Sequence, residues 1–254
     1  MSKKPQSRLN KAISIILGII AALFFVSAIV LLVSEYWPQK SNYSSFMNTS
    51  STQAPLPLNP IDFSKYKKQN EDVCGFIDFD CLDIHEPIAC AGPDKPEEYY
   101  LRRNLKGEYF TGGTVFIQKM NSTDFTDPCT VIYGHNMHNL TMFGTLKKFR
   151  DKEFFDQNEF FNIYCPGHIL KYSIKSAFVY DDRHINYAFN NFKTESDFMS
   201  FAEEVNNPKS LVKNVRESTV ITKDSKLAVL STCTNIDSER YLVVGVLVED
   251  IKTQ

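Results

Sequence analysis

The stretch that decides the fold is residues 227–248, LAVLSTCTNIDSERYLVVGVLV. It holds two apolar runs, LAVLST (227–232) and YLVVGVLV (241–248), with a short polar connection between them. Such runs predict buried strands, and the short connection favours their pairing as a hairpin. In that hairpin Cys233, at the end of the first strand, would face Arg240, at the start of the second.

Similar short runs recur through the rest of the chain. Each is continuously apolar or alternates apolar with polar residues, which is typical of strands. At least seven strands within about 180 residues favour a barrel or a sandwich. We expect a mainly β fold, a barrel of about eight strands. The further predicted strands are VCGFIDF (73–79), GTVFIQKM (113–120), TVIY (130–133), EFFNIY (159–164), ILKYSIKSAFVY (169–180) and STVIT (218–222).

Helices are predicted as insertions between these strands. Apolar residues at helical spacing predict a helix over 139–149 and another over 194–205. The second begins with Thr194 and Asp197, which resemble a capping box. The segment IDFSKYKKQNED (61–72) predicts a leading N-terminal helix.

The composition is that of a folded protein with an uneven charge. Of the 254 residues, 43% are hydrophobic and 23% are charged, which excludes a wholly disordered chain. The net charge is −2, but the first eleven residues carry four basic side chains and no acid, which leaves −6 for the rest. A net negative charge on the rest of the chain opposes binding to the negatively charged phosphate backbone of a nucleic acid. We expect no nucleic-acid partner.

Residues 12–33 form an uncharged apolar run of 22 residues. As a helix it would measure about 33 Å, enough to cross a hydrocarbon core of about 30 Å. A cleaved signal peptide is the alternative, but its apolar region usually has only about 7–15 residues. The basic flank predicts a single-pass signal anchor in the cell membrane, with residues 1–11 in the cytoplasm and the remainder extracellular.

A flexible tether would follow the anchor. Residues 34–62 are mostly polar and contain several prolines, which is typical of a linker. Residues 63–254 would then form the extracellular catalytic domain.

Six cysteines outside a membrane first suggest a disulfide framework. A head of about 190 residues can build a core without such bonds. If Cys233 is a working thiol, five cysteines remain, and an odd number cannot all pair. Their spacing matches no zinc signature. We expect mostly free or partly buried thiols.

Two segments could carry chemistry. TVIYGHNMHN (130–139) ends a strand and presents His135 directly after a glycine, and the hairpin presents Cys233 and Arg240. A thiol, an imidazole and a guanidinium supply the nucleophile, the acid/base and the oxyanion stabiliser of acyl transfer. Each of these three residues has a simpler interpretation. Cys233 could be a buried apolar residue, Arg240 could be a charge at the edge of the sheet, and His138 could be the acid/base in place of His135. HNMH also has metal-like spacing, but without a third ligand nearby we expect no metal.

Together these segments resemble the sortase family, the cysteine transpeptidases of Gram-positive cell surfaces. The likeness rests on three segments: YGHNMHNLTMFGTLKKF (133–149), LSTC (230–233) and the downstream arginine. The helical insertion near 194–205 is similar to that of class B sortases. The N-terminal part of the head also resembles the opening strands of that class, through VCGFIDF (73–79), IHEP (84–87) and EYYLRRNLKGEY (98–109). The likeness spans about residues 70–250.

This chain departs from the family pattern at three places. Val229-Leu230 replaces the usual Thr-Leu, and the loop from the cysteine to the arginine is short. Asn235 stands where class B often has an aspartate, which puts a carboxylate aid to the histidine in doubt.

The resemblance implies an extracellular, closed sortase-type β-barrel enzyme of class 3.4.22 without a metal or organic cofactor. Cys233 would attack a C-terminal sorting signal similar to NPxTN or PxTG, with His135 as the acid/base and Arg240 at the oxyanion. Tyr133, Ser231 and Tyr187 match residues that line the substrate groove.

Its partners would be surface proteins that carry the signal, an amine of a cell-wall peptide or lipid-linked precursor, and the membrane through residues 12–33. A hydrolytic cysteine peptidase and a non-catalytic binding module remain the alternatives. The sorting motif, the acceptor amine and the oligomeric state are left open by the sequence.

Overall fold

The computed structural model describes residues 56–254. The predicted tail (1–11), the predicted anchor (12–33) and most of the predicted tether (34–62) lie outside the described residues, and the domain boundaries stay predictions. Within 56–254, no helix combines the length and the hydropathy that crossing a membrane requires.

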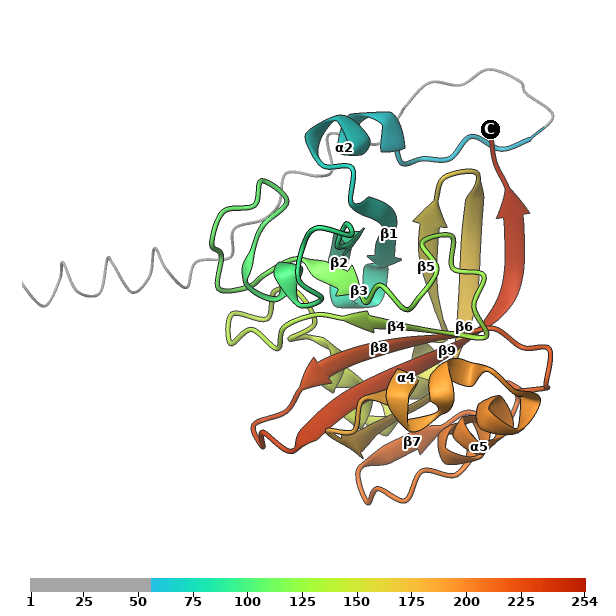
Figure 1. The fold of residues 1–254 in the computed structure, drawn as a ribbon. Helices are drawn as coiled ribbons and strands as arrows, with labels where there is room; N and C mark the ends of the chain where they lie inside the picture. The colour runs from blue at the N-terminus through green and yellow to red at the C-terminus, as the bar shows by residue number, and fades with distance from the viewer. Residues whose placement is uncertain (1–55) are drawn as a thin grey trace, which may run out of the picture. The chain divides into compact units, whose positions relative to one another are not determined.

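Nine strands form one sheet in the order β5-β1-β2-β3-β4-β8-β9-β6-β7 (Figure 1). A further pairing between β5 and β6 closes the first eight into a barrel, and β7 adds to the outside of β6. This confirms the predicted closed barrel of about eight strands. The strands are β1 (Val73–Phe79), β2 (Ile84–Cys90), β3 (Val115–Ile117), β4 (Cys129–Tyr133), β5 (Phe160–Cys165), β6 (His168–Asp181), β7 (Lys213–Val215), β8 (Leu227–Cys233) and β9 (Glu239–Lys252).

Short helices fill the connections of the barrel. The predicted leading helix is present as α2, and the predicted helix near 194–205 is present as α5. In α5 the Thr194 side chain accepts from the Asp197 N–H, and the Asp197 side chain accepts from the Thr194 N–H, so the capping box is confirmed. The helices are α2 (Phe63–Gln69), α3 (Lys152–Gln157), α4 (Ile185–Ala188) and α5 (Glu195–Asn206), with 3₁₀ turns η2 (Asp80–Leu82), η3 (Tyr99–Arg102), η4 (Leu146–Arg150) and η5 (Asn190–Phe192).

The helix predicted over 139–149 is wrong in its first half. Leu140 and Met142 have left-handed backbones, with φ of 63° and 54°, and a continuous α-helix does not accept such residues. Only η4 forms, at Leu146–Arg150. Met142, Leu146 and Phe149 are nevertheless buried, so the apolar spacing identified the core-facing residues without identifying their backbone.

The strand predicted over 218–222 is also wrong. Thr219 and Ile221 are buried while Val220 is 68% exposed, so the alternation is real. The Thr219 hydroxyl lies 2.8 Å from the Ser173 hydroxyl of β6, but the segment is outside every strand ladder. The strand that pairs with β6 in this region is β7, which the periodicity did not predict.

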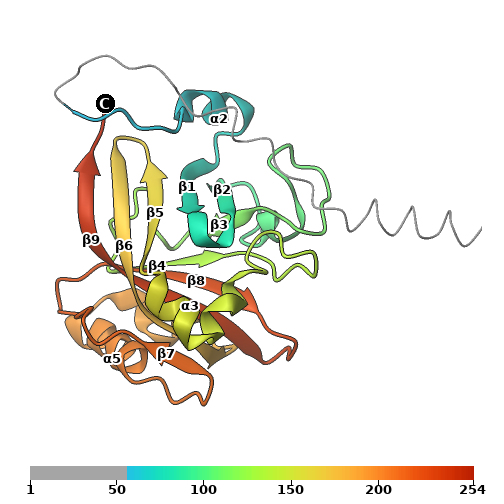
Figure 2. The same cartoon turned by 180° about the vertical axis from the view of Figure 1, so that it is seen from behind.

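The β8–β9 hairpin buries both of its faces. Leu230, Tyr241 and Val243 join the core inside the barrel, together with η4 and α3. Val229, Leu242 and Val244 join a second core with residues of α4 and α5. Figures 1 and 2 show α4 and α3 on opposite sides of these strands. Because side chains alternate along a strand, neighbouring residues at the end of β8 serve two different surfaces.

Candidate active site

Cys233 and Arg240 face each other at the open end of the β8–β9 hairpin. The antiparallel register pairs Thr232 with Tyr241 and Cys233 with Arg240, as the sequence predicted. Directly paired residues of an antiparallel ladder project from the same face. The thiol and the guanidinium therefore share one face at the rim of the sheet.

His135 lies in the loop after the neighbouring strand β4. Strands β4 and β8 are parallel, and Tyr133 pairs with Ser231. The Gly134 N–H donates to the Ser231 carbonyl at 3.1 Å, so the contact continues past the last paired residue. β4 ends at Tyr133, and His135 follows two residues later in the loop, while Cys233 follows Ser231 by two residues on β8. The strand order β4-β8-β9 therefore puts the segment that carries His135 on one side of β8 and Arg240 of β9 on the other.

The imidazole of His135 is held in a defined tautomer. Its Nε2 lies 2.6 Å from the carbonyl oxygen of Leu101, and because a carbonyl only accepts, Nε2 carries the hydrogen. Burial lowers the pKa of His135, the Leu101 hydrogen bond partly opposes this, and Arg102 lowers it further. The neutral ring thus keeps its lone pair on Nδ1, which suits a base.

Gly134 makes the position of His135 possible. A Cβ atom at Gly134 would come within 2.6 Å of the Phe143 ring, which is fully buried. The loop folds back here, because the Phe143 N–H donates to the His135 carbonyl at 3.0 Å. The Tyr-Gly-His sequence therefore places a histidine on a loop that is clamped to the core.

Arg240 is fixed by the loop that precedes it. Its Nη1 donates to the carbonyls of Asp237 at 2.8 Å and Glu239 at 2.9 Å. Within the described residues, neither Nη2 nor Nε has an acceptor, so donors of the guanidinium fork remain for a ligand. Burial raises the pKa of the Tyr133 hydroxyl, and the positive charge of Arg240 opposes that effect.

The three predicted groove residues fall into two groups. Tyr133 and Ser231 are register partners on β4 and β8. Tyr187 comes from α4 and is 71% exposed. The ring of His184 connects the two groups, with its centroid 6.4 Å from that of Tyr133 and 4.4 Å from that of Tyr187.

His184 was not predicted from the sequence. Both of its ring nitrogens are buried without a hydrogen-bond partner among the described residues, and burial lowers its pKa. Its position three residues before Tyr187, a predicted groove residue, is the signal in the sequence that could have identified it.

All six cysteines are free thiols, and Cys233 alone among them is exposed. Burial raises the pKa of Cys81 to about 11 and that of Cys165 to about 12. The expectation of free thiols is confirmed. An exposed Cys233 also disagrees with the interpretation of this residue as a buried structural thiol.

The described residues bring one group of possible metal ligands together, Asp78, Asp80 and His85, beside the β1–β2 turn. It includes neither His135 nor His138. His85 Nδ1 already lies 2.5 Å from the Asp78 carboxylate, within hydrogen-bond distance. His138 is exposed on the loop after His135.

A closed β-barrel with an exposed thiol paired to an arginine at its rim is the arrangement of the sortases, a class of cysteine transpeptidases. No known family model matches the chain. The curated sortase B of Listeria monocytogenes is 31% identical over 186 residues, which cover 72% of this chain and 72% of that protein. The chain belongs to the sortase B family, and the resemblance predicted from the sequence is confirmed.

Solved structures agree with this assignment. A Bacillus anthracis protein described as similar to sortase B is 28% identical, with a TM-score of 0.65 over 79% of this chain and 90% of that one. A Staphylococcus aureus sortase B–substrate complex has the same fold, with 20% identity and a TM-score of 0.65 over 88% of this chain and 94% of that one.

Proposed function

We propose that this chain is a membrane-anchored sortase B that cleaves a C-terminal sorting signal and joins the surface protein to an amine of the cell wall. The pairing of Cys233 on β8 with Arg240 on β9, with His135 two residues after the end of the neighbouring strand β4, is the observation that carries the proposal. The signal would be similar to NPxTN or PxTG, and the chemistry belongs to the thiol-dependent class 3.4.22.

In the first half-reaction Cys233 attacks the threonine carbonyl of the signal. The neutral Nδ1 of His135 takes the thiol proton, a C–S bond forms, and the peptide C–N bond breaks as His135 returns the proton to the leaving amine. The product is a thioester on Cys233. A lowered pKa supports this role, because it keeps His135 unprotonated and ready to act as a base at neutral pH.

Arg240 stabilises the negative charge that develops on the attacked carbonyl oxygen. Nη1 is used in fixing the side chain, and the remaining donors are available for the oxyanion. Tyr133, Ser231, His184 and Tyr187 would line the groove for the signal, on the face of β8 that also carries Cys233. The S. aureus relative, which was solved as a substrate complex, supports a substrate site on this fold.

The proposed location follows from the sequence. An anchor at residues 12–33 would keep the barrel at the outer membrane face, where signals and lipid-linked wall precursors would both be present.

Mass spectrometry of the purified protein with candidate sorting peptides tests the proposal. We expect an adduct on Cys233 with the mass of the acyl fragment, and its loss when an amine is added. Cys233→Ala should give no adduct, while Cys90→Ala, a matched control at a half-buried thiol, should react normally. Cleavage by the Cys233→Ala variant would overturn the proposal.

A further inference from the structure

One hydrogen bond orients the imidazole of His135, and its acceptor is a main-chain oxygen. The Nε2–H donates to the Leu101 carbonyl at 2.6 Å, and among the described residues the ring makes no other hydrogen bond. A base that activates a nucleophile is usually oriented in turn by a third group. In this protein that third group is the carbonyl of Leu101.

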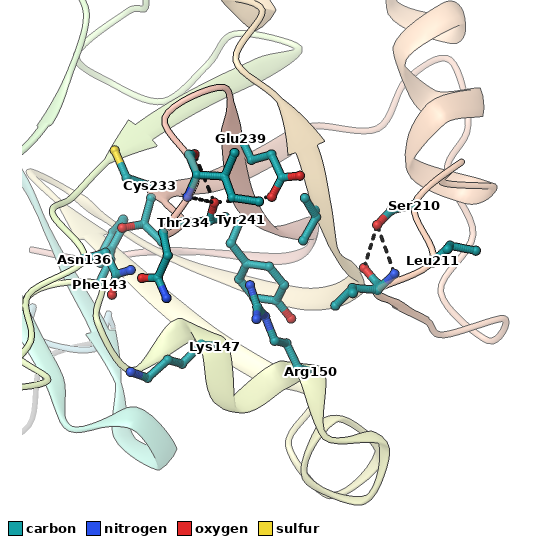
Figure 3. A pocket seen from close by; sticks show the side chains of 15 residues that line it. Asn136, Phe143, Lys147, Arg150, Ser210, Leu211, Cys233, Thr234, Glu239 and Tyr241 are labelled. Carbon is teal, nitrogen blue, oxygen red and sulfur yellow. Dashed lines mark hydrogen bonds between the residues drawn. The ribbon is translucent and has the colours of Figure 1, made fainter.

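No carboxylate takes this role within residues 56–254. The segment after His135 lies beside the thiol, because Asn136 and Cys233 line the same pocket (Figure 3). The acidic side chain of that pocket, Glu239, forms its hydrogen bond within its own loop. The orientation of the imidazole therefore depends on what holds the Leu101 carbonyl in place.

The backbone of Gly113 packs closely against the Leu101 carbonyl. Gly113 has a φ of 60°, and a Cβ atom there would lie 2.6 Å from the Leu101 oxygen and 2.5 Å from the Tyr100 oxygen. Both are main-chain atoms, so they cannot turn away as a flexible side chain can. The next residue adds a hydrogen bond, because the Thr114 N–H donates to the Tyr100 carbonyl at 3.0 Å. A side chain at position 113 would thus displace the acceptor that holds His135.

Tyr100 anchors the same 3₁₀ turn, η3, to the start of β1. Its side chain is fully buried, and its hydroxyl donates to the Asp72 carboxylate at 2.5 Å. The Asn70 side chain donates to that hydroxyl at 2.7 Å, and the Lys95 ammonium donates to Asp72 at 2.6 Å. Burial raises the pKa of Asp72, but the hydrogen bonds from Lys95 and Tyr100 outweigh burial and lower it. The carboxylate is therefore charged at neutral pH and holds the tyrosine through a charge-assisted hydrogen bond.

We propose that Gly113 and Tyr100 are positioning residues for the catalytic histidine and act through the Leu101 carbonyl. The inference rests on the proposed role of His135 as the base. The carbonyl fixes the tautomer with its hydrogen on Nε2, which leaves Nδ1 to take the thiol proton. Because the carbonyl is neutral, it stabilises the protonated ring less than a carboxylate would, so the base stays unprotonated at neutral pH.

The contact with Leu101 also affects the pH dependence of the reaction. Burial lowers the pKa of His135, the Leu101 hydrogen bond raises it, and the charge of Arg102 in η3 lowers it. Loss of the Leu101 hydrogen bond should therefore lower this pKa further. The acidic limb of kcat/KM should then move to lower pH, because the reaction needs the unprotonated ring. A change that only loosened the fold would not move this limb.

Two glycines between η3 and β3 provide a matched test. Gly113 and Gly107 both have a positive φ, of 60° and 80°, so alanine strains both backbones. At Gly107 the nearest atom to a Cβ is the Tyr99 hydroxyl, 2.9 Å away, at the end of a side chain that can turn. The test measures the acyl adduct on Cys233 of the full chain with one sorting peptide.

We expect Gly113→Ala to slow adduct formation at saturating peptide by about 10²-fold, the cost of misplacing a catalytic group by about 1 Å. Its acidic limb should move to lower pH. Gly107→Ala should melt at a temperature similar to that of Gly113→Ala, but keep a rate and an acidic limb close to those of the wild type.

Tyr100→Phe tests the same link without backbone strain. The change removes the hydrogen bond to Asp72, so it should slow adduct formation and move the acidic limb in the same direction, by less than Gly113→Ala does. Tyr99→Phe is its matched control, because a phenylalanine there keeps the ring contact with the Arg103 guanidinium. This control should behave as the wild type does.

The outcomes separate this inference from the proposed function. Equal rates and equal acidic limbs for Gly113→Ala and Gly107→Ala would overturn the inference and leave His135 as the base. If Gly113→Ala does not fold, Tyr100→Phe decides alone, and a variant with the wild-type rate and acidic limb would overturn the inference. Full activity of His135→Ala in the same assay would instead overturn the proposed function.

Discussion

His135 and His138 lie three residues apart on the loop after β4, and His135 is the nearer to the end of the β4–β8 ladder at Tyr133 and Ser231. His135→Ala should lower kcat/KM for peptide cleavage by about 10²–10⁴, the usual contribution of a general acid/base. His138→Ala should leave most of the activity, because His138 is exposed. Steady-state kinetics on both variants checks this, and the reverse pattern would show that the acid/base is His138.

Arg240 presents a planar fork of donors where the oxyanion would form, and a lysine offers only a compact point charge. Arg240→Ala should lower kcat by about 10²–10³, the typical cost of a lost oxyanion donor. Arg240→Lys should recover only part of this loss. The rate of Cys233 alkylation and the melting temperature serve as controls for an intact fold. If Arg240→Ala raised KM and left kcat unchanged, the residue would bind substrate uniformly and would not stabilise the oxyanion.

At the scale of the elements, the β1–β2 pair contains a half-buried carboxyl, that of Glu86. Glu86 lies opposite Ile77, and burial raises its pKa to about 7 from an ordinary value of 4.5. The unfolded chain releases this proton near pH 4.5, whereas the folded chain keeps it to about pH 7. Between these values the folded state binds more protons, so stability falls as the pH rises.

Glu86→Gln should therefore remove this part of the pH dependence. The difference in unfolding free energy between pH 5 and pH 8 should shrink by at most about 3 kcal/mol, at about 1.4 kcal/mol per pKa unit. Denaturant unfolding at both pH values measures the change. Glu249→Gln, on an exposed part of β9, is the matched control. An unchanged difference in the Glu86 variant would show that its carboxyl ionises normally in the folded state.

The sequence predicted elements well where their own residues decided them, and poorly where a neighbour did. The β8–β9 hairpin and α5 followed from periodicity and capping, and the register of Cys233 with Arg240 followed from the short connection. The loop over 139–145 did not, because the left-handed backbones of Leu140 and Met142 interrupt a helix that the apolar spacing alone would allow, although Met142 still reaches the core. His184 was missed for a similar reason, since its neighbours Tyr133 and Tyr187 come from separate elements.

At the scale of the whole molecule, the first described residues are attached to the barrel. The Asn59 side chain donates to the Cys165 carbonyl at 2.8 Å, and Ile61 is buried. A chain that begins at residue 35 should therefore be soluble and still cleave the peptide in vitro. A chain that begins at residue 63 loses both contacts, so it should melt at a lower temperature. Thermal unfolding and peptide cleavage of both chains check this, and an inactive but folded 35–254 chain would contradict the anchor-plus-head organisation.

The parallel pairing of β4 with β8 has a consequence for how activity arises during folding. Tyr133 and Ser231 are neighbours in the sheet but lie 98 positions apart in the chain. Contacts of such long sequence separation carry a high loop-closure cost and are slow to form. The segments that carry His135 and Cys233 therefore come together only when the barrel closes, so before that stage the chain holds a thiol without its proposed base. Recovery of peptide cleavage during refolding would thus report the last stage of folding.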